Sequence, residues 1–174
     1  MSRRALKLAV RNEIRTTLSY AVKDCDTGMD GRPPPSCGQV FVSVHSGRRT
    51  SSSRECLEEE YSISVTVTMR VGPGWDRFTQ EMIDKATTGL EQRADNIRVC
   101  VHRDCMDNRI RVAANALITG DSNEFAEPLM FEDDEPPREV GPDWFHAEGV
   151  GTAGLVMQLN FGKAKRIQNL DDMT

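Results

Sequence analysis

The chain has 174 residues, of which 38% are hydrophobic and 28% are charged, and its formal net charge is −5. A chain of this length can bury a substantial core as one domain, so its folding requires neither a metal nor a disulfide. It lacks an apolar leader at the N-terminus and any run of the roughly 20 apolar residues that a membrane-spanning helix needs. We therefore expect a soluble protein that is not exported by these routes.

The charges are unevenly distributed along the chain. Residues 1–56 carry ten basic and five acidic side chains, whereas residues 57–174 carry twelve basic and twenty-two acidic ones. This asymmetry favours self-association in which the basic region of one copy meets the acidic region of the next, and an ordinary solvated surface explains it equally well.

The N-terminal part predicts a helix followed by a connector and a strand. Residues 3–24 carry one apolar stripe with a spacing of four, formed by Leu6, Val10, Ile14, Leu18 and Val22. The segment 27–37 contains two glycines and the triplet Pro33–Pro35, which cannot continue a helix or a central strand. In residues 39–45 every second residue is apolar, and this alternation predicts a strand.

The clearest pattern lies between residues 57 and 101. Alternating apolar residues from Tyr61 to Val71 predict a long, half-buried strand, which Gly72–Gly74 interrupts. Helical spacing over 75–95 then predicts an amphipathic helix with Asp76 as its N-cap. A second short alternation follows, the pattern of a strand, formed by Ile97, Val99 and Val101.

Between the first two strands, residues 46–55 read as an exposed, mobile hairpin loop. This segment holds four consecutive hydroxyl residues and three cations, Arg48, Arg49 and Arg54. The three adjacent acids Glu58–Glu60 follow it, and neighbours in a strand point to opposite faces, so they cannot all converge on one metal ion. We interpret them as a solvated strand end.

The C-terminal half predicts a second core helix at 107–120, an acidic surface segment and a final strand. Residues 121–148 contain ten acids, four prolines and a single cation, Arg138. Within them, Trp144 and Phe145 are apolar enough to contact the body or another subunit. Both faces of the strand over Leu155–Phe161 carry apolar residues, which predicts a central position in the sheet. The strand ends in a basic tail with Lys163, Lys165 and Arg166. This tail is a further candidate for a subunit or partner contact.

No catalytic or metal-binding pattern is found. The only cluster of metal-ligand types is Cys100, His102 and Cys105, whose cysteines are separated by four residues with no second pair elsewhere, unlike zinc sites. Five cysteines scattered through a domain that needs no bridges favour free thiols. The chain has no phosphate-binding glycine loop, nucleophile elbow or helical histidine pair. We therefore expect no cofactor, no metal and no enzymatic activity.

These elements predict one α+β domain over residues 1–174: a mostly antiparallel sheet of strands near 39–45, 58–71 and 153–162, with helices 3–24 and 75–95 packed on it. Their order resembles the tail terminator proteins of long-tailed bacteriophages. The resemblance rests on the helix, the Gly/Pro-rich connector, the strand 39–45, the polar loop, the long strand Tyr61–Val71, the Gly72–Gly74 break, the amphipathic helix and the final strand 154–162. The acidic segment 121–148 and the cysteines depart from the shorter family members.

The resemblance implies a virion protein, assembled in the host cytoplasm, that forms a hexameric ring on the end of the tail tube. Such a ring stops tube polymerisation and joins the tail to the head connector. The implied partners are further copies of the chain, the tail tube protein, the head-tail connector and DNA passing through the lumen, with no membrane. We expect Arg48, Arg49 and Arg54 to face that lumen or a ring interface, although a loop exposed to solvent fits the sequence equally well. Two alternatives are another neck or tail-tube component, and a small metal-dependent enzyme that processes nucleic acid.

Overall fold

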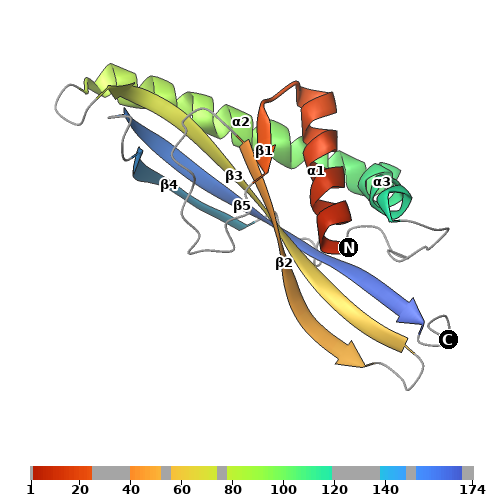
Figure 1. Ribbon diagram of the computed structural model, residues 1–174. Coiled ribbons are helices and arrows are strands. Elements are labelled where there is room, and N and C mark those ends of the chain that lie inside the picture. Colours follow the sequence, from red (N-terminus) through yellow and green to blue (C-terminus); the bar gives the residue numbers. More distant parts are fainter. Residues whose placement is uncertain are drawn as a thin grey trace.

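The alternating strands and the helical stripes combine in an α+β fold (Figure 1). A computed structural model describes residues 2–24, 40–51, 56–73, 78–118, 138–147 and 152–169. The elements in chain order are α1 (Ser2–Leu18), β1 (Val22–Asp24), β2 (Val40–Ser51), β3 (Cys56–Pro73), α2 (Gln80–Asp107), α3 (Arg109–Leu117), β4 (Arg138–Ala147) and β5 (Thr152–Asn169). The predicted connector 27–37 lies outside the described residues.

The strands form one sheet in the order β1-β2-β3-β5-β4. The pairs β2–β3, β3–β5 and β4–β5 are antiparallel, and only the three-residue β1 runs parallel to its neighbour. The predicted mostly antiparallel sheet is therefore confirmed. β5 lies between β3 and β4, as the apolar residues on both of its faces predicted.

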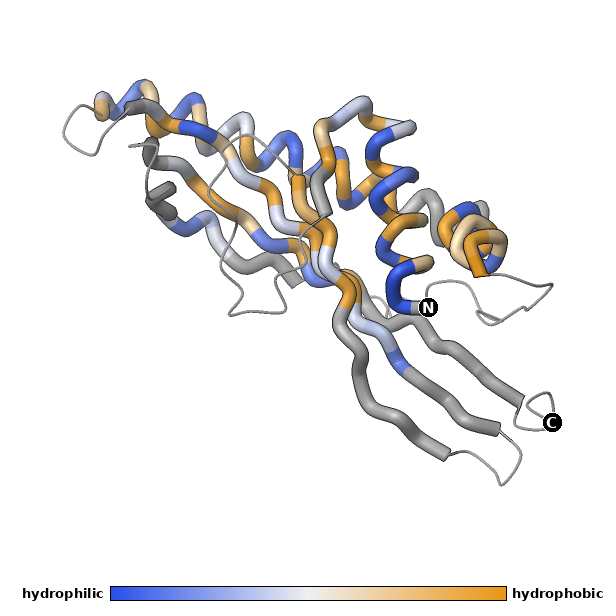
Figure 2. The backbone as a smooth tube through the Cα atoms, viewed as in Figure 1, coloured by the Kyte–Doolittle hydropathy of each residue, from blue (hydrophilic) through white to orange (hydrophobic). Residues whose placement is uncertain are grey.

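The register places the apolar faces of the strands in common rows. Val42 stands opposite Val65, which stands opposite Leu159, and all three are fully buried. α1 and α2 cover this face with residues at three- and four-residue spacing, which Figure 2 shows as recurring hydrophobic positions along each helix. The buried residues of these helices include Leu6, Val10, Ile14, Ala86, Leu90, Ala94, Ile97 and Val101.

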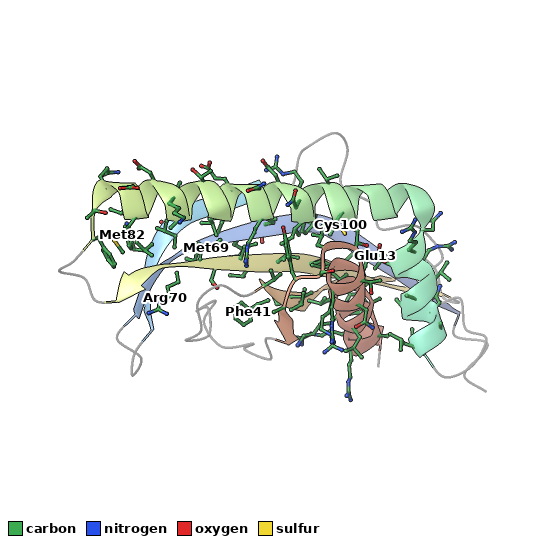
Figure 3. The ribbon with its side chains drawn as sticks, turned by 90° about the horizontal axis from the view of Figure 1, so that it is seen from above. Glu13, Phe41, Met69, Arg70, Met82 and Cys100 are labelled. Carbon is green, nitrogen blue, oxygen red and sulfur yellow. The ribbon has the colours of Figure 1, made fainter. Side chains whose placement is uncertain are left out.

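Close contacts between α2 and β3 are made possible by a glycine. A Cβ added at Gly89 of α2 would lie 3.1 Å from Cε of Met69 on β3. Figure 3 shows Met69 at this layer, between the long helix and the sheet. Phe41 lies on the row of Thr66 and Gln158, which belongs to the opposite face of the sheet, and it is also buried.

The first predicted helix is too long by six residues. α1 ends at Leu18, where Ser19 adopts a left-handed conformation with φ 55°, and Val22 lies in β1. The N–H of Val40 donates to the carbonyl of Ala21 over 3.2 Å, so the chain turns from the helix directly into the sheet. The helix was predicted to extend too far because Val22 is apolar and continues the four-residue spacing of the stripe.

The second predicted helix is too short, and the strand pattern at Ile97–Val101 is wrong. α2 continues unbroken to Asp107. Ile97 and Val101, four residues apart, are fully buried, whereas Val99 is 64% exposed. Apolar residues at 97, 99 and 101 fit the alternation of a strand, and those at 97 and 101 also fit the four-residue interval of a helix. The buried residues Leu90 and Ala94 belong to the same helical stripe and precede them.

The N-cap of α2 is Thr79, and not Asp76, which lies outside the described residues. The Thr79 side chain accepts a hydrogen bond from the N–H of Met82 over 3.3 Å, and the backbone of Thr79 is extended. This arrangement satisfies one of the amides that have no partner within the first helical turn.

Removal of this cap is expected to destabilise the protein modestly. Thr79→Ala should lower the free energy of unfolding by about 1 kcal/mol, because the Met82 amide loses its side-chain acceptor and keeps only the Thr79 carbonyl, at 3.1 Å. Thr88→Ala is the matched control, since Thr88 is exposed in the interior of the same helix. Urea unfolding of both variants measures the difference, and equal effects would contradict the assignment of the cap.

The structure places strands within two segments that the sequence predicted to be loops. β2 runs to Ser51 and β3 begins at Cys56, so residues 46–51 belong to the sheet, with a register shift between Ser46 and Arg49. The acidic segment contains β4 at Arg138–Ala147, with a second shift between Val140 and Asp143. The sequence predicted loops here because glycines and a proline lie at these register shifts. Such residues are also tolerated in bulges at the edges of sheets.

Candidate interaction surface

Three strands of the sheet continue past β1 and β4 as an arm. We define the arm as residues 43–51 of β2, 56–64 of β3 and 161–169 of β5, because β1 pairs with β2 only up to Val42 and β4 pairs with β5 only up to Asn160. Figure 1 shows its outer part extending beyond α1 and α3. This arm is the most distinctive feature of the described chain.

The predicted basic residues lie on the outer strands of the arm, beside an acidic central strand. Arg49 of β2 and Arg166 of β5 both stand opposite Glu59 of β3, and Lys165 stands opposite Glu60. In this register, basic positions of the outer strands therefore stand opposite acidic positions of the central strand. Local sequence could not indicate the pairing with β5, because Arg166 is about 100 residues from Glu59 in the sequence. The interpretation of Glu58–Glu60 as a solvated strand end stays a prediction.

Five of the six predicted cations of this region are placed differently from expectation. Arg48 and Arg49 are in β2 and not in a loop, and Arg54 lies outside the described residues. Lys163, Lys165 and Arg166 are part of β5, which continues to Asn169, and not of a tail that follows it. The structure therefore brings Arg49 and Arg166 onto one row with Glu59, one on each side of it.

The base of the arm is tied to the first helix. The Nε of Arg3 in α1 donates to the carbonyl of Val44 in β2 over 2.6 Å. Val44 lies two residues beyond Val42, the last residue of β2 that pairs with β1. Its carbonyl therefore has no acceptor site filled by β1, and the Arg3 side chain supplies a donor. A charged donor makes a stronger hydrogen bond than a neutral one, so this contact fixes where the arm leaves the body.

The arm has two open edges. Among the described residues, 43–51 of β2 and 161–169 of β5 pair with β3 and with no other strand. Long open edges pair readily with other chains, and proteins limit this with bulges and with basic residues. Both devices are present, as register shifts at Ser46/Arg49 and Ser62/Ile63 and as the cations named above.

The predicted contact residue Trp144 lies at the opposite end of the sheet. Its ring stacks on Phe78, just before α2, with 5.5 Å between the ring centroids, and the residue remains 41% exposed. Trp144 stands opposite Leu155, and Phe145 stands opposite Gly154. Trp144 therefore extends the core at the edge strand while leaving part of its indole accessible.

Two further surfaces belong to the helices. The outer side of α3 exposes Val112 and Leu117, at 58% and 48%, while Ile110 and Ala114 are buried on its inner side. Arg109 of α3 and Glu13 of α1 form an ion pair over 3.7 Å beside this packing. The spacing in the sequence assigned Leu117 to the core together with Ile110 and Ala114, and the structure places Leu117 on the exposed side.

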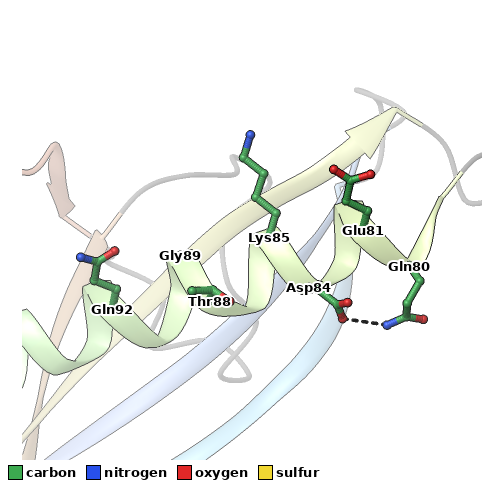
Figure 4. Close-up of a pocket in the computed structure, with 7 residues that line it drawn as sticks. All are labelled: Gln80, Glu81, Asp84, Lys85, Thr88, Gly89 and Gln92. Atoms are coloured by element: carbon green, nitrogen blue, oxygen red, sulfur yellow. Dashed lines mark hydrogen bonds between the residues drawn. The ribbon is translucent and has the colours of Figure 1, made fainter.

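An open groove runs along the exposed face of α2 (Figure 4). All of its lining residues come from this one helix, and they are Gln80, Glu81, Asp84, Lys85, Thr88, Gly89 and Gln92. The Gln80 amide donates to Asp84 over 2.8 Å. The lining contains neither histidine nor cysteine.

Metal and membrane sites are not found in the described part of the chain. No group of three histidine, cysteine or acidic side chains there is placed to hold a metal ion, and the Cys100 side chain is buried. None of the described helices combines the length and the hydropathy needed to cross a membrane. The thiols of Cys25, Cys37, Cys56 and Cys105 lie outside the side chains that the structure describes.

The class that the geometry defines is an α+β protein with a projecting three-stranded arm. Comparison with models of known protein families found no match, and comparison with curated proteins found none of similar sequence.

Proposed function

We propose that the chain is a structural virion protein, a tail terminator that assembles as a homo-oligomeric ring, on the resemblance a hexamer, on the end of a phage tail tube. In this role it stops tube polymerisation and joins the tail to the head connector. The observation that carries the proposal is the arm, with its opposed basic and acidic positions and two open edges. Such a surface suits contacts with other polypeptides better than the binding of a small substrate.

The order of the secondary structure elements is the second support. The sheet contains the strands on which the resemblance to tail terminators rests, with α1 and α2 packed on it. The open groove on α2, lined by one helix, gives no support to the alternative of a nucleic-acid-processing enzyme. Another neck component would use the same arm. A tail-tube component would also use it, and it differs in being present in many copies along the tail.

Loss of the arm cations is expected to block joining while leaving the fold intact. The variant Arg48→Ser/Arg49→Ser/Arg54→Ser removes three cations from β2 and the segment that follows it. We expect about a tenfold or larger fall in the yield of completed particles, because a ring repeats any weakened contact in every subunit. The circular dichroism spectrum of the variant should be the same as that of the parent protein.

The control removes the same charge from the body of the protein. Arg4→Ser/Arg15→Ser/Lys85→Ser changes three exposed helical cations. Electron microscopy of lysates measures tail length and joining for both variants. Normal yields of infectious particles from the arm variant would rule out a role of these arginines in joining.

A further inference from the structure

The outer side of α3 is apolar and exposed. We define the α3 face by its four exposed apolar residues, which are Val112 (58% exposed), Ala113, Ala116 and Leu117 (48% exposed). The inner side of the same helix buries Ile110 and Ala114. A helix that is apolar on both sides is normally covered on both sides, and an exposed apolar patch marks a contact with another molecule. The α3 face therefore has the composition of an interface.

The charge beside the α3 face is positive. α1 and α3 pack against each other and carry seven basic residues, which are Arg3, Arg4, Lys7, Arg11, Arg15, Arg109 and Arg111. They carry one acidic residue, Glu13, which forms an ion pair with Arg109 over 3.7 Å. A surface with an apolar centre and acidic residues around it is complementary to this end of the protein.

The other end of α2 presents such a surface. Trp144 of β4 stacks on Phe78, with 5.5 Å between the ring centroids, and remains 41% exposed. Within residues 78–85 and 141–144 the charged residues are all exposed, and they are the acids Glu81, Asp84 and Asp143 and the single cation Lys85. We call the two rings and the three acids the tryptophan surface.

One subunit cannot bring these two surfaces together. They lie toward opposite ends of α2, which has 28 residues and is therefore about 40 Å long (Figure 1). A symmetrical contact between two α3 faces would oppose positive charge to positive charge, and one between two tryptophan surfaces would oppose negative to negative. A head-to-tail contact between copies matches the apolar groups and the charges at once. Contacts of this kind close into rings when the rotation between subunits permits it.

We propose that the α3 face of one copy packs on the tryptophan surface of the next copy. In this contact Val112 and Leu117 cover the exposed part of the Trp144 indole. The cations of α1 and α3 face the three acids of the tryptophan surface. The contact rests on the proposed ring, and it deepens that function by naming the two faces through which neighbouring subunits join.

Two variants with new charges at exposed positions test the contact. The α3 variant is Val112→Glu/Ala116→Glu, and the tryptophan-surface variant is Glu81→Lys/Asp84→Lys. Each alone should weaken self-association by about 100-fold in Kd, because like charges then oppose each other in every contact. An equimolar mixture should regain association, since the introduced glutamates then meet the introduced lysines and the two parental surfaces meet each other.

Matched controls place the same charge changes in the middle of α2. They are Gln92→Glu/Asn96→Glu for the α3 variant and Glu91→Lys/Asp95→Lys for the tryptophan-surface variant, all at exposed positions. Both controls should associate like the parent. Circular dichroism verifies that each variant is folded.

Native mass spectrometry of the variants and of their mixture measures the association. Loss in both variants with recovery in the mixture supports the head-to-tail contact. Loss in the α3 variant alone would overturn it in favour of a symmetrical contact, and loss without recovery would overturn it as well. An unchanged ring in both variants would overturn the contact and leave the proposed function standing. Recovery that yields only open chains of subunits would support the contact and contradict the ring.

The fluorescence of Trp144 gives a readout at the contact itself. The chain has two tryptophans, so Trp75→Phe leaves Trp144 as the only one. Acrylamide quenching of Trp144 should decrease as the protein associates with increasing concentration, and in the α3 variant it should stay constant over the same range. Unchanged quenching in an associating protein, or a chain that stays monomeric at every concentration, would overturn the contact.

Discussion

Replacement of Val67 by aspartate is expected to destabilise the protein severely. Val67 is fully buried on β3, between Val40 of β2 and Met157 of β5. The carboxylate would lie among apolar side chains without a partner, at a cost of about 4 kcal/mol or more. Domains are stable by roughly 5–15 kcal/mol, so this one change removes a large share of the total.

Arg70→Asp provides the control on the same strand. Arg70 is exposed, three residues from Val67, and stands opposite Gly154. The same introduced residue should therefore cost no more than about 1 kcal/mol there. Guanidinium chloride unfolding followed by circular dichroism compares both variants with the parent. A Val67→Asp variant as stable as Arg70→Asp would contradict the register of the sheet.

A second large loss of stability is expected from an aspartate at Ile97, and almost none from an aspartate at Val99. Ile97 is fully buried and Val99 is 64% exposed, because both belong to α2. Ile97→Asp should lower the free energy of unfolding by about 3 kcal/mol or more, since the charge enters the core. Val99→Asp should change it by less than about 0.5 kcal/mol, because aspartate and valine have similar helix propensities.

This pair distinguishes a helix from a strand directly. In a strand, residues 97, 99 and 101 would share one face, and the two substitutions would have similar costs. Thermal unfolding of both variants measures the ratio of the two effects. Equal destabilisation would mean that residues 97–101 are extended.

The parts of the fold that the sequence predicted well are those with a long, regular pattern. The alternation from Tyr61 to Val71 defines β3, because only one register buries Val65 and Val67 together. The helical stripes of α1 and α2 are equally clear, and their wrong boundaries lie where a single apolar residue, such as Val22, fits two structures. Short patterns of three residues do not distinguish periods of 2 and 3.6.

The arm was not predictable in the same way. Local sequence assigned Arg48 and Arg49 to a loop, because glycine and hydroxyl residues surround them. Their place in β2 depends on pairing with β3, and the place of Glu59 depends on Arg166, which no local periodicity can detect. β4 was missed for a similar reason, since Gly141 and Pro142 are tolerated there at an edge with a register shift.

The most direct test of the proposed assembly is the mass of the protein in solution and on isolated particles. Native mass spectrometry of the purified chain, whose subunit mass is 19.5 kDa, should give one closed ring, six subunits on the family resemblance, with no enzymatic turnover and no bound metal. Quantitative mass spectrometry of intact virions should find the same number of copies per tail. A monomer with stoichiometric zinc, or a copy number that grows with tail length, would contradict the account.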